Sequence, residues 1–359
     1  MSGPTPSSST TPSSSTTPSS STTPSARSLP GLDLDRLSAY LEKEEPELLA
    51  DGALTASLIP GGRSNLTYEL GDRWVLRRPP LGHVLATAHD MGREHRVLSA
   101  LADSPVPVPA TVHSCADPSV IGAPFYIMER VSGTVYRSTE QARAALGEAG
   151  AAALARDLVA VLAALHGIDP PRYGLEDFGR PEGFLHRQVK RWRTQLDGSR
   201  SREVPGIDEL AERLASRIPT TQRHSIVHGD FRLDNCLVAG SGRVAAVLDW
   251  EMSTLGDPLT DVGLLRVYWT AGGRSRLDPA GGSPLVPVAD MISEYAGGSD
   301  LDLEPLPWYV AFGYFKLAVI LEGINFRYLQ GQTVGEGFDQ IGAGFDPLIA
   351  EGLDALGRD

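Results

Sequence analysis

The sequence contains only two cysteines, Cys115 and Cys236, among its 359 residues. So few thiols exclude a disulfide framework and favour a reducing compartment, and we therefore expect a cytoplasmic protein. The N-terminus also lacks the basic start and apolar run of a secretory signal. A membrane span needs about 20 apolar residues, and the most apolar stretch, 308–324, is interrupted by Lys316 and Glu322. This stretch is expected to form a buried helix, with no membrane partner.

Positive charge is scarce as well, because 32 Lys and Arg residues face 45 Asp and Glu residues and give a formal net charge of −13. Such a chain repels nucleic-acid phosphates, which argues against a nucleic-acid partner. It would also repel ATP, so a nucleotide site here requires a local cluster of cations and a metal ion. Hydrophobic residues make up 41% of the chain, enough for a sizeable core in one large or two ordinary domains.

Three regions of different composition follow one another along the chain. Residues 1–28 are rich in Thr, Pro and Ser and nearly free of apolar residues, so a disordered tail is expected. Residues 29–130 contain short apolar segments separated by turns, which predicts a sheet-rich lobe. Residues 131–359 are mostly helical in pattern and hold the motifs described below. The predicted fold class is α+β, with a cleft between two lobes where ligands commonly bind.

The pattern also predicts individual elements. In the first lobe we expect strands at 56–59, 66–70, 74–77 and 125–128 and one helix at 88–101. In the second lobe we expect helices at 142–166, 184–196 and 207–218 and a strand–turn–strand unit within 225–250.

The most informative segment is His-Gly-Asp-Phe-Arg-Leu-Asp-Asn at 228–235, followed by Leu-Asp-Trp-Glu at 248–251. Asn235 follows Asp230 by five residues, which is the spacing in the catalytic loop of kinases. Kinases also have a metal-binding Asp further along the chain. Phosphoryl transfer needs mainly a positioned hydroxyl and neutralised charge. We therefore predict that Asp230 accepts the hydroxyl proton, while Asn235 and Asp249 hold Mg²⁺.

The chain between these groups predicts how they meet. Strands are expected at 236–238 and 244–248, with a turn at 239–242. Antiparallel strands joined by a turn place their outer ends together, so the amide of Asn235 should lie beside the carboxylate of Asp249.

With Leu-Gly-Asp-Pro at 255–258, this pattern resembles the aminoglycoside phosphotransferase and choline kinase family over roughly residues 30–350. It is most similar to the bacterial branch related to the kinase-like domains fused to some acyl-CoA dehydrogenases. The resemblance implies a bilobal protein-kinase-like fold, with a small antiparallel-sheet N-lobe and a larger, mainly helical C-lobe. It also implies that Asp257 and Asp261 support the helix after the metal loop. His228 is expected to be structural.

Two upstream segments complete the predicted nucleotide site. The Pro-Gly-Gly-Arg-Ser-Asn loop lies between two expected strands, and although such a turn alone only connects strands, the resemblance favours a phosphate-covering role for Gly62, Ser64 and Asn65. The Phe-Tyr-Ile-Met-Glu-Arg-Val segment resembles the strand and hinge beneath the adenine. Backbone groups at Glu129 and Val131 are therefore expected to contact the base.

Arg77 ends a strand at the place where this fold usually carries a phosphate-binding Lys. Arg78 is the adjacent alternative, and strand alternation points the two side chains to opposite faces. Glu94 shares a helical face with apolar residues and needs a partner if that face is buried. Arg77 is expected to be this partner, in the ion pair that kinases use to position phosphate. The alternative places Glu94 at the edge of the stripe, in water.

Basic residues on the substrate side are Arg187, Lys190, Arg191 and Arg193 on one expected helix and Arg327 on another. A solvated basic face is the usual interpretation. In a chain this acidic, cations beside the cleft would suit an anionic acceptor such as a hydroxyacyl-CoA, with Arg187, Arg191 and Arg327 as substrate residues. Polycationic aminoglycosides would instead need an acidic pocket.

The leading hypothesis is transfer of the γ-phosphate of ATP, or alternatively GTP, to a hydroxyl of a small molecule, with Mg²⁺ as cofactor. Three alternatives stay open: an antibiotic O-phosphotransferase, a metal-dependent hydrolase that uses His228, Asp230 and Asp249 as ligands, and a catalytically silent nucleotide-binding regulatory module. The remaining histidines lack ligand spacing around that set, which disfavours the hydrolase. The identity of the acceptor and the oligomeric state are not determined by these patterns.

Overall fold

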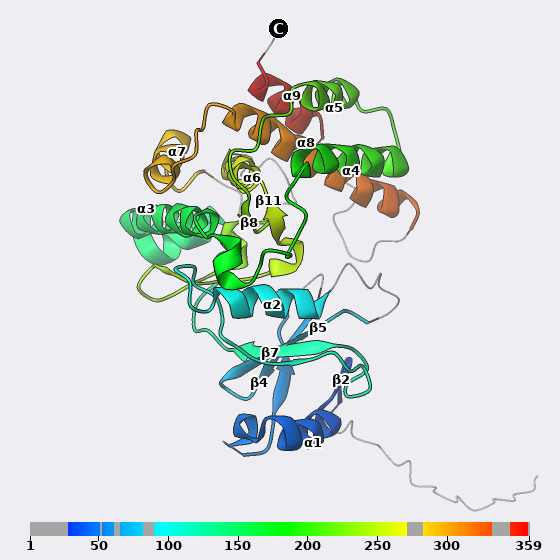
Figure 1. The fold of residues 1–359 in the computed structure, drawn as a ribbon, viewed down its shortest axis with the longest axis vertical. Helices are drawn as coiled ribbons and strands as arrows, with labels where there is room; N and C mark the ends of the chain where they lie inside the picture. The colour runs from blue at the N-terminus through cyan, green and yellow to red at the C-terminus, as the bar shows by residue number, and fades with distance from the viewer. Residues whose placement is uncertain are drawn as a thin grey trace, which may run out of the picture.

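The structure, a computed structural model, describes residues 28–50, 52–60, 65–81, 90–270, 283–331 and 345–357. The fold is α+β and bilobal, of the protein-kinase-like type, as predicted. Figure 1 shows the small sheet lobe below the larger helical lobe, with α2 between them. Most of the predicted tail, together with Gly62 and Ser64, lies outside the described residues.

The small lobe is built around a five-stranded antiparallel sheet in the order β3-β4-β5-β7-β6. Its strands are β3 (Ala56–Leu58), β4 (Leu66–Leu70), β5 (Trp74–Arg78), β6 (Thr111–Cys115) and β7 (Phe125–Glu129). The elements that accompany the sheet are β1 (Ser28–Leu29), β2 (Leu32–Asp33), α1 (Leu34–Glu44), a 3₁₀ turn (Pro46–Leu49) and α2 (Met91–Leu101). Helix α2 begins three residues later than expected, because the side chain of Asp90 caps its first turn.

The two faces of this sheet belong to different hydrophobic cores. Tyr68, Leu76 and Ile127 pack on one face in a small core together with α1. Alternate residues such as Val75 and Tyr126 lie on the other face, in a large core that continues through α2 into the helical lobe. The large core therefore extends through both lobes. The domain boundary at residue 130 stays a prediction.

The large lobe contains helices that surround two small strand pairs. Its helices are α3 (Thr139–His166), α4 (Phe184–Ser199), α5 (Ile207–Ser216), α6 (Leu259–Thr270), α7 (Val288–Gly297), α8 (Leu306–Leu329) and α9 (Phe345–Ala355). Its strands and 3₁₀ turns are β8 (Ser225–Val227), β9 (Cys236–Val238), β10 (Val244–Val247), β11 (Thr254–Gly256), Pro170–Tyr173, Leu233–Asn235 and Trp250–Met252. Strands β9 and β10 form the predicted hairpin, and β8 pairs with β11.

Helix α8 lies at the centre of the large lobe and packs against α4, α5, α6 and α9. It approaches α6 closely at Gly263, where an added Cβ would lie 2.5 Å from the backbone of Tyr309. Only glycine fits such a contact. This close packing brings side chains of α6 and α8 to the same loop, at residues 228–235.

We expected no segment to be long and apolar enough to span a membrane, but judged by length and composition alone this expectation was wrong. Helices α3 and α8 are both long enough to cross a membrane, and each contains an 18-residue segment of high mean hydropathy with at most two charged residues. However, 61% of that segment in α3 and 72% in α8 is buried inside the protein. Core helices of soluble proteins have the same character, which agrees with the predicted burial of 308–324.

Candidate active site

The motif at 228–235 forms the loop between β8 and β9, and its glycine is required by the local geometry. Gly229 has φ +86°, in the left-handed region. A Cβ at this position would lie 2.9 Å from the carbonyl oxygen of Met252. The loop therefore packs directly on the segment that follows Asp249.

Asp261, at the start of α6, fixes the backbone of this loop. Its Oδ2 accepts the N–H of His228 at 2.7 Å, and its Oδ1 accepts the N–H of Gly229 at 2.8 Å. Sequence analysis assigned Asp261 and Asp257 to support of the helix. Asp257 does so by accepting the N–H of Leu259 at 3.1 Å. Asp261 lies in the first turn of α6, where a carboxylate favours the helix, and it binds the preceding loop as well.

We expect Asp261→Asn to lower the free energy of unfolding by about 1–3 kcal/mol, because one buried backbone N–H loses its acceptor. Burial works to raise the pKa of Asp261, but the hydrogen bond and charge of His166 outweigh it and hold this pKa below its usual 3.8. The carboxylate thus stabilises the fold above about pH 4, and this contribution disappears as pH falls through the lowered pKa. Denaturant unfolding would measure the free energy of unfolding of both proteins, and the difference between wild type and variant should be smaller in acid than at pH 7. Asp197→Asn, at an exposed position on α4, is the control.

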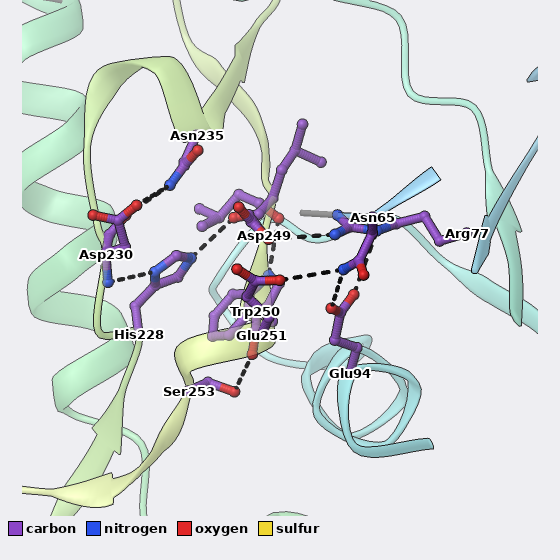
Figure 2. A network of polar contacts seen from close by, with 12 residues as sticks. Asn65, Arg77, Glu94, His228, Asp230, Asn235, Asp249, Trp250, Glu251 and Ser253 are labelled. Atoms are coloured by element: carbon purple, nitrogen blue, oxygen red, sulfur yellow. Dashed lines mark hydrogen bonds and ion pairs between the residues drawn. The ribbon is translucent and has the colours of Figure 1, made fainter. Parts of the chain in front are cut away.

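Asp230 and Asn235 are joined directly. The Nδ2 of Asn235 donates to the carbonyl oxygen of Asp230 at 2.8 Å and to its Oδ2 at 3.1 Å. Since the amide nitrogen is directed to Asp230, the amide oxygen is the atom of Asn235 that suits a metal. Figure 2 shows this pair beside the group formed by Asp249, Glu251 and Arg77.

His228, for which a structural role was predicted, contacts backbone groups of two segments. Its side chain is buried, its Nε2 lies 3.0 Å from the carbonyl oxygen of Leu248, and its Nδ1 accepts the N–H of Asp230 at 3.3 Å. The ring thereby connects the catalytic loop to the residue before Asp249.

The predicted hairpin brings the backbone of Asn235 beside Leu248, the residue before Asp249. Cys236 pairs with Val247, and the N–H of Leu248 donates to the carbonyl oxygen of Asn235 at 2.8 Å. Asp249 itself has φ 64°, the one positive φ at a non-glycine residue in the described part of the chain. Such backbone conformations are costly and are common at functional sites.

The predicted ion pair between Arg77 and Glu94 is present, with 3.4 Å between Nε and Oε2. Arg77 also reaches Asp249, with 3.3 Å between its guanidinium and Oδ1, so it joins both lobes. Its neighbour Arg78 points to the opposite face and donates to the carbonyl oxygens of Gly31 and Ile121. Arg77 is thus the arginine at the cleft.

Glu94 is buried and held by several donors, which excludes its placement in water. Tyr126 donates its hydroxyl to Oε2 at 2.8 Å, and Asn65 donates its amide to Oε1 at 3.1 Å. Burial raises the pKa of Glu94, while Arg77 and Tyr126 oppose that rise. Asn65 also donates to Glu251 at 3.3 Å, so the predicted phosphate-loop residue bridges the two lobes.

Glu251 is a site residue that sequence analysis missed. Carboxylate oxygens of Glu94, Asp249 and Glu251 all lie within 4.8 Å of one another. Glu94 is buried, whereas Asp249 and Glu251 are partly exposed, so these two are the carboxylates better placed to meet a cation. Because all the candidate donors are oxygens, the set fits Mg²⁺. The signal was available in the sequence, since Glu251 lies two residues after Asp249.

The hinge segment keeps two of its backbone donors within the sheet. The N–H of Glu129 donates to the carbonyl oxygen of Ala110 at 2.8 Å, and that of Arg130 to Arg73 at 2.7 Å. The backbone groups predicted to contact the base are therefore the carbonyl of Glu129 and the N–H of Val131, because the N–H of Glu129 is already used.

A cavity of about 450 Å³ lies between α4, α6, α8 and the segment after Asp249. Four cationic side chains line it: Arg180, Arg187, Arg191 and Lys316. Of the predicted substrate residues, Arg187 and Arg191 are thus at the cavity. Arg327 is not, because it is exposed at the last turn of α8, apart from the cavity walls in the described structure.

Lys316 links this cavity to the catalytic loop. Its ammonium donates to the carbonyl oxygen of Gly229 at 2.8 Å and lies 5.7 Å from the ring of Trp192. Burial lowers the pKa of Lys316, while the charges of Asp230 and Asp261 oppose that effect. Trp192 also lines the cavity, and its buried indole N–H has no hydrogen-bond partner among the described residues. Both features suit a cavity that receives a polar ligand.

Comparison with known proteins decides the family. Residues 55–283 match the model of the phosphotransferase enzyme family. The chain belongs to this family. A phosphotransferase-family crystal structure from Ralstonia eutropha, provisionally named an aminoglycoside phosphotransferase, superposes with a TM-score of 0.76 at 32% identity over 90% of this chain and 98% of the other. The GDP complex of aminoglycoside 2'-phosphotransferase-IIIa has a TM-score of 0.60 at 15% identity over 89% and 99% of the two chains, and shares the fold.

Curated relatives of this phosphotransferase-family chain are larger proteins. Acyl-CoA dehydrogenase family member 11 of Gallus gallus is 34% identical over 86% of this chain and 41% of its own length. Family member 10 of Mus musculus is 36% identical over 78% of this chain and 27% of its own length. The chain therefore spans about two fifths or less of these relatives.

Proposed function

We propose that this protein is an Mg²⁺-dependent small-molecule kinase that transfers the γ-phosphate of ATP, or of GTP, to a hydroxyl of an anionic metabolite. The observation that carries the proposal is that Asn235 binds Asp230 and lies, through the β9–β10 hairpin, beside the residue before Asp249. This arrangement occurs in a phosphotransferase-family fold, near a cavity with cationic walls. Arg77 and Glu94 supply the ion pair that such a nucleotide site requires.

In this proposal Asp230 is the general base. The acceptor hydroxyl gives its proton to the carboxylate of Asp230 as its oxygen forms a bond to the γ-phosphorus. The bond between that phosphorus and the β,γ-bridging oxygen breaks, and ADP leaves with the electron pair. Asp230 later releases the proton to solvent.

Asn235 through its amide oxygen and Asp249 and Glu251 through their carboxylates would hold Mg²⁺, which neutralises phosphate charge when bound. Arg77 lies beside Asp249 and would contact the phosphates. Asn65 would cover them from the small lobe, together with Gly62 and Ser64 outside the described residues. The carbonyl of Glu129 and the N–H of Val131 would contact the base.

The acceptor class follows from the cavity. Its four cationic side chains outnumber the two carboxylates in its wall, Glu251 and Asp261. This balance favours a carboxylate, a phosphate or a CoA ester over a polycationic antibiotic. The dehydrogenase relatives support a hydroxyacyl-CoA within this class. Both cysteines are free and buried, in keeping with a cytoplasmic location.

The proposed activity can be tested on an acceptor panel. Purified protein would be incubated with Mg·ATP or Mg·GTP and 3-hydroxybutyryl-CoA, choline or kanamycin, and phosphorylated products would be identified by mass spectrometry. We expect product with the hydroxyacyl-CoA. Product from kanamycin alone would favour an antibiotic phosphotransferase, and Mg·ATP binding without any product would favour a regulatory module.

Within the cavity, Arg191→Gln should raise the KM for an anionic acceptor about three- to tenfold, because a partly exposed charge-assisted contact is lost. The value of kcat should change little, since the contact is remote from the transferred phosphate. Steady-state kinetics with 3-hydroxybutyryl-CoA would measure both. Lys190→Gln is the matched control, because Lys190 is exposed on the same helix but does not line the cavity. An equal effect of both variants would contradict a specific role for Arg191.

A further inference from the structure

The carboxylate of Asp230 has a second hydrogen-bond donor, which comes from a different element. Tyr268, near the end of α6, donates its hydroxyl to Oδ1 of Asp230 at 2.9 Å. Asn235 donates to the other oxygen, Oδ2, at 3.1 Å. One donor on each oxygen fixes the rotation of the carboxylate about its terminal bond. Each oxygen keeps a further lone pair for an incoming hydroxyl.

Tyr268 is itself held in place by two residues of the catalytic motif. The guanidinium of Arg232 lies over its ring, 4.5 Å from the ring centre. Asp234 binds that guanidinium with both carboxylate oxygens, one of them at 3.0 Å. These contacts connect Arg232 and Asp234 to the site, although neither residue is assigned as the base or as a metal ligand.

The hydroxyl of Tyr268 can act only as a donor towards Asp230. Burial, followed by the negative charge of Asp230, raises the pKa of Tyr268 well above its usual value. The phenol therefore keeps its proton at neutral pH. A hydrogen bond from the neutral phenol to the carboxylate stabilises the negative charge of Asp230.

We propose that Tyr268 is a positioning residue that orients the carboxylate of Asp230 towards the acceptor hydroxyl, and that Arg232 and Asp234 hold Tyr268 for this purpose. The inference rests on the proposed function, because it assigns Tyr268 a role through the general base. Tyr268 does not itself touch the transferred group. Loss of its hydroxyl should therefore lower kcat and leave nucleotide binding unchanged.

The test is a double-mutant cycle on Tyr268→Phe and Asp230→Asn. Initial rates of ADP release from Mg·ATP would be measured with 3-hydroxybutyryl-CoA as acceptor and, separately, with water alone. Tyr268→Phe should lower kcat about 10- to 100-fold, as expected for loss of a hydrogen bond to a charged group, with the KM for ATP within about twofold of wild type. In the Asp230→Asn background the same change should have almost no further effect.

Tyr314→Phe is the matched control. Its hydroxyl lies 3.2 Å from Thr270 at the same end of α6, and it would report a general loosening of that helix. Thermal unfolding of all variants would show that they fold. Wild-type kcat in Tyr268→Phe would overturn the inference, as would an equal loss in the Asp230→Asn background. Wild-type rates in Asp230→Asn would instead overturn the proposed function, so the two failures are distinct.

Discussion

Asp230→Asn is expected to lower kcat by about 10²- to 10⁴-fold, because the transferred hydroxyl loses the group that accepts its proton. Asparagine has nearly the same shape, so contacts with Asn235 and Tyr268 can persist in part and the loop should stay folded. Binding of Mg·ATP should be retained, since the base lies on the acceptor side. Turnover by coupled ADP release and binding by isothermal titration calorimetry would separate the two effects.

The control for this variant is Asp197→Asn on the exposed surface of α4, which removes one negative charge without touching the site. It should keep wild-type turnover. Unchanged kcat in Asp230→Asn would refute the role of Asp230 as base and, with it, the kinase mechanism. Loss of both turnover and folding would be recognised by thermal unfolding, and Asp230→Glu would then test whether a displaced carboxylate restores part of the rate.

The second large effect is expected for Asp249→Ala, which should weaken binding of Mg·ATP by about 10- to 100-fold or more. Changes to the outer shell of a metal site already have effects of that size, and this change removes a proposed ligand itself. It also removes the partner of Arg77 across the cleft, although Arg77 keeps its contact with Glu94. Titration calorimetry with ATP in Mg²⁺ and in EDTA would measure the metal-dependent part.

In EDTA the wild type and Asp249→Ala should bind ATP with similar, weak affinity, because the metal no longer contributes to either. If Asp249→Ala instead bound Mg·ATP as tightly as wild type, the assignment of Asp249 to the metal would be wrong. Glu251→Gln gives a graded comparison. A smaller loss there would place Glu251 as the secondary carboxylate, and no loss would exclude it from the metal site.

Sequence patterns predicted most of the elements that position the site. Strand β4 and strand β9 have the expected bounds, and the turn between β9 and β10 brings Asn235 to the residue before Asp249. These features depend on short-range rules, namely strand alternation and hairpin closure. Such rules act within a few residues, so they can be followed along the sequence. The ion pair of Arg77 and Glu94 was predicted on a different basis, namely helical spacing, the need to pair a buried charge and the pair that kinases use to position phosphate.

Tyr268 of α6 and Lys316 of α8 could not be found in this way. Lys316 was noted only as an interruption of an apolar stretch, yet a buried charge needs a partner, and its ammonium contacts Gly229. Tyr268 had no distinguishing pattern at all. Arg327 was grouped with the basic residues on charge alone, but its helix carries it away from the cavity.

By itself, the sequence determined the family, the fold class and the residues of the catalytic motif, because these lie in continuous segments with characteristic spacing. Only the tertiary structure decided which arginine joins the two lobes, which cations line the cavity and which donors bind the carboxylate of Asp230. The physical reason is that these relations arise where the close packing of α6 on α8, and of the sheet on α2, brings distant segments into contact. Contacts across such distances depend on how whole elements pack, which no local pattern records.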